Sequence, residues 1–376
     1  MTVRFEDPDG LGAKLYQVDW LLPALAAMLG FVGVVAIFSA TSGVWMDGAF
    51  QHGTRIALAF MAMLIVAMID IRVWYSLAYP AYLAGLVLLV AVDVAGINVN
   101  GSQRWLGVGP VRVQPSELMK PAVVLAMARY YHDLPSWRVS NALGLLGGLV
   151  LIGLPMMLVL RQPDLGTSLL IGATGVAVIF LAGVSWRVIT LASIMAAVSA
   201  PLVWQFGLKA YQRERILTFL DPSRDPAGAS YHITQSKIAF GSGGMSGKGF
   251  GRGTQQDGGF VPENLTDFIS TIIGEEFGFI GMLAVMGLYM AVIGACIRLS
   301  VQARTVFARL LIMGLTVTFT LYVFINLGMV TGLLPVVGVP LPLVSYGGTV
   351  VLVVMGGFGL MLSAHLHSGA TLPKSE

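Results

Sequence analysis

Charged residues are scarce in this chain of 376 residues. Asp, Glu, Lys and Arg make up only 11% of it, whereas soluble domains contain about 25%. Hydrophobic residues make up 56%, and the mean hydropathy is +0.81. The shortage of charge, together with long uncharged runs, excludes an ordinary soluble domain and predicts an all-α polytopic membrane protein.

The chain also has only one cysteine, and it contains neither a nucleotide-binding motif nor an internal repeat. The single Cys296 excludes an internal disulfide, and we interpret it as a small apolar residue near a helix end. There is no Walker A motif and no internal repeat of the kind that inverted-repeat transporters show. No clear set of metal ligands is present, so no cofactor is assigned, although a divalent cation such as Mg²⁺ is compatible with the chemistry below. No nucleic-acid partner is expected.

Ten segments are candidates for membrane-spanning helices. Seven are uncharged runs of the ~20 residues that a span requires, and three more carry charges, are short or follow a broken loop. The first group is 20–40, 73–92, 139–160, 165–186, 188–208, 277–297 and 310–331, and the second is 56–69, 116–133 and 342–364. We therefore expect about ten transmembrane helices in a single integral membrane domain, 1–376, with both termini on one side.

The distribution of Lys and Arg predicts the orientation of this domain. With the N-terminus inside, the short cytoplasmic segments hold ten cations and the short outer segments five, which favours cytoplasmic termini. The ten are Arg4, Lys14, Arg72, Arg129, Arg138, Arg187, Arg298, Arg304, Arg309 and Lys374, and the five are Arg55, Arg104, Arg112, Lys120 and Arg161. Residues 209–265 then form a long extracytoplasmic loop between helices 7 and 8.

The stretch Gly241–Gly281 joins a glycine-rich, cationic loop to an apolar run. Asp267 lies where the two meet, beside the cations Lys248 and Arg252, and we regard it as a candidate for chemistry at the water–lipid boundary. The alternative is that Asp267 or its neighbour Thr266 only caps the next helix, since both are good N-cap residues.

Two further polar clusters interrupt the outer ends of predicted spans. Glu117 and Lys120 are three residues apart and share a helix face; charges at membrane depth are usually paired or functional, so they are either a structural ion pair or part of a site. Asp164 follows Arg161 in a tight outer loop, where capping of the next helix explains it well.

The remaining candidates lie in the long loop and near the C-terminus. Arg213 and Arg215 are suited to hold phosphate, or they form a solvated face. Gly332–Thr349 is apolar but broken by Pro and Gly, and it includes Ser345. Such backbone persists at membrane depth only when it is buried in protein or lines a cavity, so we expect this loop to lie near Asp267.

Together these segments resemble the SEDS family of bacterial cell-envelope proteins, and its RodA branch more than its FtsW branch. The resemblance runs over nearly the whole chain. It rests on Asp19-Trp20, GSQRW (101–105), VQPSELMK (113–120), RQPDLGTS (161–168), QSKIAFGSGGMSGKGFGRGTQ (235–255), PENLTDF (262–268) and GLLPVVGVPLPLVSYGGT (332–349).

The resemblance implies a peptidoglycan glycosyltransferase that polymerises lipid II at the outer face of the bacterial cytoplasmic membrane during cell elongation. It places the essential acidic residue on Asp267 and other site residues on Glu117, Lys120 and Asp164. The family usually has His two residues before that aspartate, and here the position is Leu265, which puts a role for this His in doubt. The outer cations Arg112, Lys120, Arg213, Arg215, Lys248 and Arg252 are expected to bind the pyrophosphate, and Ser345 is expected to contact substrate.

Two other functions remain open at this point, a flippase for lipid-linked oligosaccharide and a non-catalytic scaffold for an envelope synthase. The resemblance also implies a class B penicillin-binding transpeptidase partner and other elongation-complex proteins. We expect the transpeptidase to bind spans 277–297 and 310–331. An arginine at Met286 or Leu315 should weaken this binding if either residue faces the partner.

Overall fold

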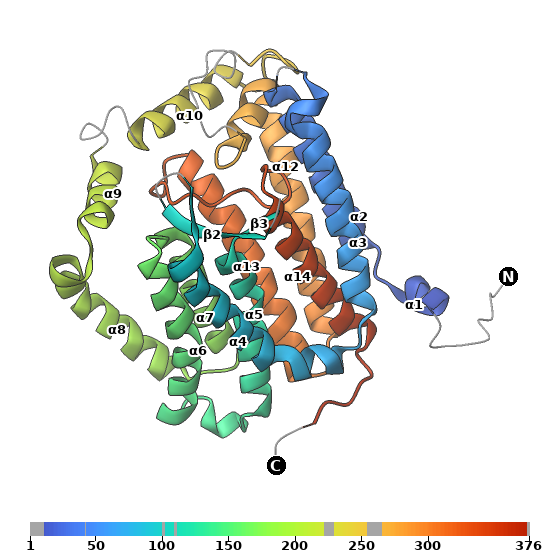
Figure 1. The fold of residues 1–376 in the computed structure, drawn as a ribbon, viewed down its shortest axis with the longest axis vertical. Helices are drawn as coiled ribbons and strands as arrows, with labels where there is room; N and C mark the ends of the chain where they lie inside the picture. The colour runs from blue at the N-terminus through green and yellow to red at the C-terminus, as the bar shows by residue number, and fades with distance from the viewer. Residues whose placement is uncertain are drawn as a thin grey trace.

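The computed structural model describes residues 11–41, 43–99, 102–108, 111–221, 229–253 and 265–373. Each of the ten expected segments coincides with a helix (Figure 1). These helices are α2 (Leu21–Ala40), α3 (Phe50–Met68), α4 (Ile71–Ala95), α5 (Pro115–Asp133), α6 (Ala142–Arg161), α7 (Leu165–Leu181), α8 (Trp186–Leu202), α12 (Ile269–Gln302), α13 (Val306–Val330) and α14 (Gly348–Leu366). The protein is therefore nearly all helical, as predicted.

Eight helices of the described chain are long and apolar enough to cross a membrane. Of the other two, α7 is apolar but only 17 residues long, and α5 contains charged residues such as Glu117 and Lys120. The protein is thus a polytopic membrane protein, and the count of ten crossings stays a prediction.

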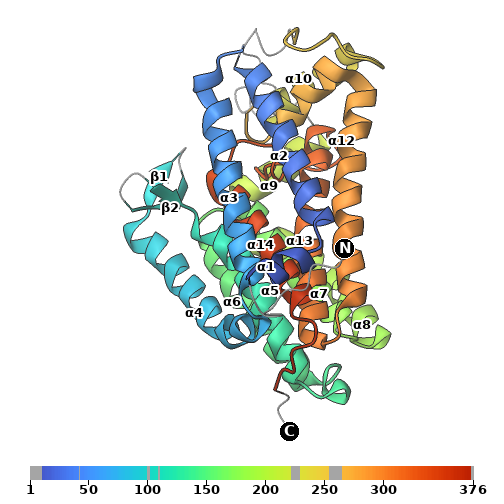
Figure 2. The same cartoon turned by 90° about the vertical axis from the view of Figure 1, so that its right-hand side faces the viewer.

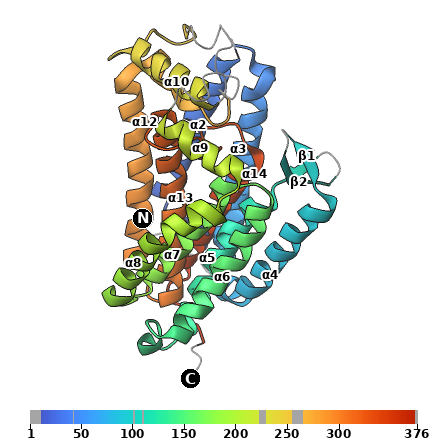
Figure 3. The same cartoon turned by 90° about the vertical axis from the view of Figure 1, so that its left-hand side faces the viewer.

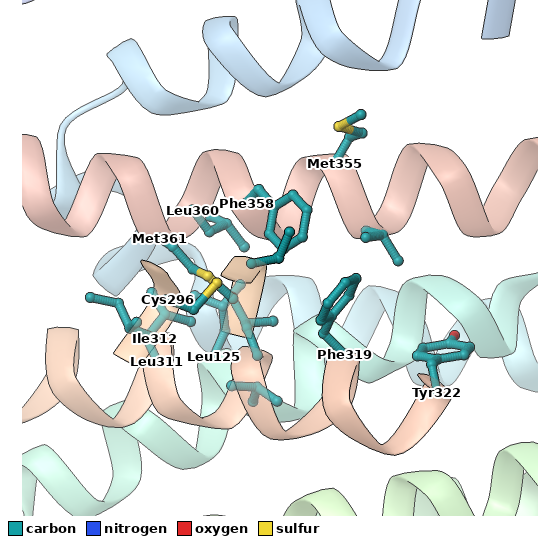
Figure 4. Close-up of a cluster of buried hydrophobic side chains, with 14 of the residues drawn as sticks. Leu125, Cys296, Leu311, Ile312, Phe319, Tyr322, Met355, Phe358, Leu360 and Met361 are labelled. Carbon is teal, nitrogen blue, oxygen red and sulfur yellow. The ribbon is translucent and has the colours of Figure 1, made fainter. Parts of the chain in front are cut away.

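Helix α13 forms the centre of the bundle. It packs against α5, α7, α12 and α14, while α14 also packs along α3, and α2 along α12. Figure 4 shows Phe319 of α13 facing Phe358 of α14, with ring centroids 5.3 Å apart. Cys296 is fully buried in the same cluster, which agrees with its interpretation as a small apolar residue.

Helix α8 differs from the nine other helices named above because none of its residues is buried. In Figure 1 it lies at the edge of the bundle and leads through the π-helix η3 (Val203–Gly207) to α9 (Ala210–Leu220) and α10 (Ala229–Gly243). The described part of the segment 209–265 therefore includes α9 and α10, and α10 packs on α12. The described residues also form the short helices α1 (Leu11–Gln17), η1 (Trp45–Ala49) and η2 (Ser136–Arg138).

A small sheet follows α4, between the segments 73–92 and 116–133 in which helices were predicted. Strands β1 (Ile97–Val99), β2 (Ser102–Val108) and β3 (Val111–Val113) are antiparallel in the order β1-β2-β3. Figures 2 and 3 show β1 and β2 beyond the end of α4, at the side of the bundle. The strands were missed because two of them have three residues, too few to show an alternating pattern.

Candidate active site

Asp267 lies in the turn that precedes α12, and its side chain is partly exposed. The N-cap of α12 is Phe268, which makes no side-chain capping bond, so neither Thr266 nor Asp267 occupies the N-cap position. The backbone carbonyl of Asp267 instead accepts a 2.8 Å hydrogen bond from Asn326 Nδ2 of α13. The carboxylate projects toward Gly338, where an added Cβ would lie 3.5 Å from Asp267 Oδ2.

The loop between α13 and α14 therefore lies beside Asp267, as the sequence predicted. It is held from several sides: Tyr346 N donates to Leu265 O (2.8 Å), Tyr289 Oη donates to Pro342 O (2.7 Å), and His52 Nε2 donates to Leu343 O (3.1 Å). Because hydrogen bonds from separate helices satisfy its carbonyls, this irregular backbone can be buried within the bundle.

Ser345 belongs to the same loop and is buried. Its hydroxyl accepts a 2.8 Å hydrogen bond from Leu341 N. In this structure Ser345 stabilises the loop that faces Asp267, and its hydroxyl is turned into the protein.

Asp164 caps α7, as expected. Its Oδ1 accepts from Thr167 N (3.1 Å), while its Oδ2 lies 3.6 Å from Arg104 Nη1 and 3.4 Å from Gln114 Nε2. Asp164 therefore joins β2 and the start of α5 to the N-terminal end of α7. This end of α7 contacts the α13–α14 loop, because a Cβ added at Gly166 would lie only 2.6 Å from Val337 O.

Glu117 and Lys120 form a buried cluster with Tyr322 of α13. Lys120 Nζ lies 2.5 Å from Glu117 Oε1, Lys120 also donates to the Tyr322 hydroxyl, and that hydroxyl donates to Glu117 Oε2. Glu117 and Lys120 are only 3% and 2% exposed, so neither reaches the surface in this conformation. This geometry favours the ion-pair interpretation over direct contact with pyrophosphate.

Lys248 is paired with Glu275 at a distance of 2.5 Å. The backbone around Lys248 also forms hydrogen bonds at Gly278, where the non-helical φ and ψ angles interrupt α12. Lys248 N and Gly249 N donate to the carbonyls of Glu275 and Glu276 (both 3.0 Å). The amides on the other side of the break are bonded by the same segment: Phe279 N donates to Gly244 O (2.9 Å) and Ile280 N to Met245 O (3.1 Å).

The other predicted cations lie on three separate segments of the chain. Arg112 on β3 and Arg252 after α10 are exposed, and Arg213 and Arg215 on α9 are partly buried. Arg213 Nη2 donates to Gln205 O (2.6 Å), so one of its donors is used within the α8–α9 connection. The structure thus leaves Arg112 and Arg252 as the predicted cations most accessible from water.

Metal binding has no support from the side chains that the structure describes. Among them, no group of three or more His, Cys, Asp or Glu residues could hold a metal ion. No step below is assigned to a metal ion.

Sequence reasoning missed Tyr322, Asn326 and Glu275. Each lies in or beside an apolar run, where a single polar residue is a signal that it has a partner inside the protein. The partners, Lys120, Asp267 and Lys248, are far away in the sequence, and only the packing of α13 and α12 brings them together.

The family model of FtsW, RodA and SpoVE cell cycle proteins matches residues 18–369. The chain is similar to the peptidoglycan glycosyltransferase MrdB of Escherichia coli (strain K12), with 47% identity over 355 residues, 94% of this chain and 95% of that protein. It is also similar to the probable peptidoglycan glycosyltransferase FtsW of Trichlorobacter lovleyi, with 34% identity over 360 residues, 93% of each chain.

Two solved structures are similar in fold. One is a chain from a peptidoglycan synthase complex that coordinates polymerization and crosslinking, with a TM-score of 0.81, 30% identity and coverage of 93% of this chain and 98% of that one. The other is the rod shape determining protein RodA of Thermus thermophilus, with a TM-score of 0.70, 27% identity and coverage of 93% and 97%.

Proposed function

The chain belongs to the SEDS family of FtsW, RodA and SpoVE cell cycle proteins, and we propose that it polymerises lipid II with Asp267 as the general base. It is a peptidoglycan glycosyltransferase. The lipid II substrate, the role of each residue, the outer-face location and the use in cell elongation are our proposals. The observation that carries them is a partly exposed carboxylate held at the junction of α12, α13 and the α13–α14 loop.

In the proposed reaction, a sugar hydroxyl of the acceptor attacks the anomeric carbon of the donor. The hydroxyl proton passes to the Asp267 carboxylate, the new glycosidic C–O bond forms, and the bond from the anomeric carbon to the pyrophosphate oxygen breaks. A positioned base contributes about 10²–10⁴-fold to such a step. The transition state has oxocarbenium character, with attack opposite the leaving group.

The pyrophosphate leaves as an anion and needs no proton if cations stabilise it. Arg112 and Arg252 are exposed, and the Lys248 side chain is 26% exposed, so these three are the cations we assign to the leaving group. Lys120 is buried against Glu117 and Tyr322, and we assign it to the packing of α5 on α13.

The Asp267→Asn variant tests the catalytic role. Asparagine keeps the size of the side chain but removes its basicity, so glycan synthesis by the purified protein should fall by about 10²–10⁴-fold while lipid II binding persists. Asp93→Asn is the matched control, because Asp93 is an exposed carboxylate at the end of α4. Near wild-type polymerisation by Asp267→Asn would refute the assignment, and a flippase or scaffold would produce no polymer in any form.

The proposed location is the bacterial cytoplasmic (inner) membrane, with both termini in the cytoplasm and residues 209–265 outside. The cationic segment around Lys248 and the Asp267 turn then face the same side. The C-terminal end of α14 lies at the opposite end of the bundle from α10 (Figure 1), as this orientation requires.

We assign the transpeptidase partner to a groove between α12 and α13. Its volume is about 560 Å³, and Met282, Met286 and Met290 of α12 line it together with Phe324 of α13. Met286 is 46% exposed there, but the expectation for Leu315 is wrong, because Leu315 is 6% exposed and lines the cavity beside Lys120. Leu315 points inward because this face of α13 packs within the bundle.

A further inference from the structure

Asn326 is a fully buried amide about one turn before the C-terminal end of α13, the central helix of the bundle. Burying an amide costs about 1–3 kcal/mol unless its groups are hydrogen-bonded. Its Nδ2 donates two hydrogen bonds of 2.8 Å, to Asp267 O and to Val339 O. Because both neighbours are carbonyl acceptors, the amide nitrogen must face them.

We propose that Asn326 is a positioning residue for glycan synthesis, which holds the Asp267 backbone and the α13–α14 loop at a fixed separation and thereby places the Asp267 carboxylate. This inference rests on the proposed role of Asp267. The amide oxygen of Asn326 has no hydrogen-bond partner among the described residues, so the two donated bonds are what the side chain contributes.

The turn that carries Asp267 leads directly into α12. Phe268 is the N-cap of that helix, and both the amide and the hydroxyl of Thr271 donate to Phe268 O. An Asp carboxylate is two rotatable bonds from its backbone, so a shift of the backbone moves the carboxylate with it. Misplacing a catalytic group by about 1 Å can cost about 10²-fold in rate.

The second hydrogen bond of Asn326, to Val339 O, also holds a segment that lies beside the Asp267 carboxylate. Val339 follows Gly338, whose Cα faces Asp267 Oδ2. A second link, from Tyr346 N to Leu265 O, ties the two segments together two residues before Asp267. Asn326 is the side chain that holds both segments at once, and it does so from α13, the same helix that carries Tyr322 one turn earlier.

The test uses Asn326→Leu, which is similar in size and has no donor, and Asn326→Ser, which retains one donor. The matched control is Thr316→Val, because Thr316 is a buried residue of α13 whose hydroxyl donates within its own helix, to Ile312 O (2.7 Å). Three quantities are measured on the purified full-length protein: kcat for lipid II polymerisation, KM, and hydrogen–deuterium exchange of the amides of residues 265–270.

Asn326→Leu should lower kcat by about 10–100-fold and change KM by less than about threefold, because a positioning residue acts on the chemical step. Exchange at 265–270 should become faster. Asn326→Ser should be intermediate in both measurements, and Thr316→Val should resemble the wild type. If the Leu variant does not fold, the Ser variant carries the same comparison.

Unchanged exchange at 265–270 in a folded Asn326 variant would overturn the clamp, and faster exchange with unchanged kcat would overturn its role in the reaction. A loss that appears only in KM would also contradict positioning. The proposed function has its own test, because full activity of Asp267→Asn would refute it. The hydrogen–deuterium exchange of the Asn326 variants does not depend on catalysis, so the two failures can be told apart.

Discussion

At the residue scale, Gly278 shows how one backbone conformation organises the segment that follows Asp267. Its φ is +65° and its ψ is −160°, a region that is essentially restricted to glycine. The break exposes carbonyls and amides on either side, and the backbone of residues 244–249 bonds to four of them. The glycine-rich stretch is thus a structural support for the first part of α12, in addition to carrying Lys248.

Gly278→Ala should therefore destabilise the protein. An added Cβ would lie 2.4 Å from Gly247 N, and the conformation itself costs a non-glycine residue about 1–3 kcal/mol. Gly287→Ala is the matched control, because it lies in the same helix with open space around its Cβ position. We expect a clearly lower midpoint of thermal unfolding for Gly278→Ala only. Equal midpoints for the two variants would show that the break in α12 has no structural importance.

At the scale of elements, all ten apolar segments could be predicted because a span is a local property of about 20 residues. The cluster of α5 and α13 could not. Glu117 and Lys120 were visible as a pair at i and i+3, but Tyr322 lies 202 residues from Lys120, and nothing local in an apolar run indicates its partner. The same holds for Asn326 and Asp267, whereas the position of Gly332–Thr349 near Asp267 was predicted from its broken, apolar backbone.

The buried cluster predicts partial rescue by charge exchange. Glu117→Lys or Lys120→Glu alone removes the opposite charge and buries two like charges side by side. Breaking a buried pair costs about 3–5 kcal/mol, and the like charge adds to that cost. The double exchange restores one charge of each sign, and the Tyr322 hydroxyl can donate to one and accept from the other. Thermal stability and polymerisation should therefore recover much of what each single variant loses. A stable but inactive double variant would instead indicate that Lys120 contacts substrate directly.

At the scale of the whole molecule, the proposed orientation is tested by cysteine labelling. Ser246, between α10 and α12, and Ser136, between α5 and α6, are both exposed, and native Cys296 is fully buried, so background labelling should be low. A membrane-impermeant maleimide should label Ser246→Cys in intact spheroplasts and Ser136→Cys only after permeabilisation. The reverse pattern would invert the topology and place Asp267 in the cytoplasm.

The groove between α12 and α13 makes the partner proposal testable in the same membrane setting. An arginine at Met286 would place a charge inside the groove, where a partner helix would have to bury it at a cost of several kcal/mol, so co-purification with the transpeptidase should be lost. Met61→Arg is the matched control, because Met61 of α3 is 61% exposed and lies outside the groove. Equal retention of the partner by the two variants would move the interface to another face. Met286 is exposed on α12, whereas Asp267 precedes the first turn of that helix. Met286→Arg should therefore lose the partner while the isolated chain polymerises at an unchanged rate. That result would show that partner binding and catalysis use different parts of the protein.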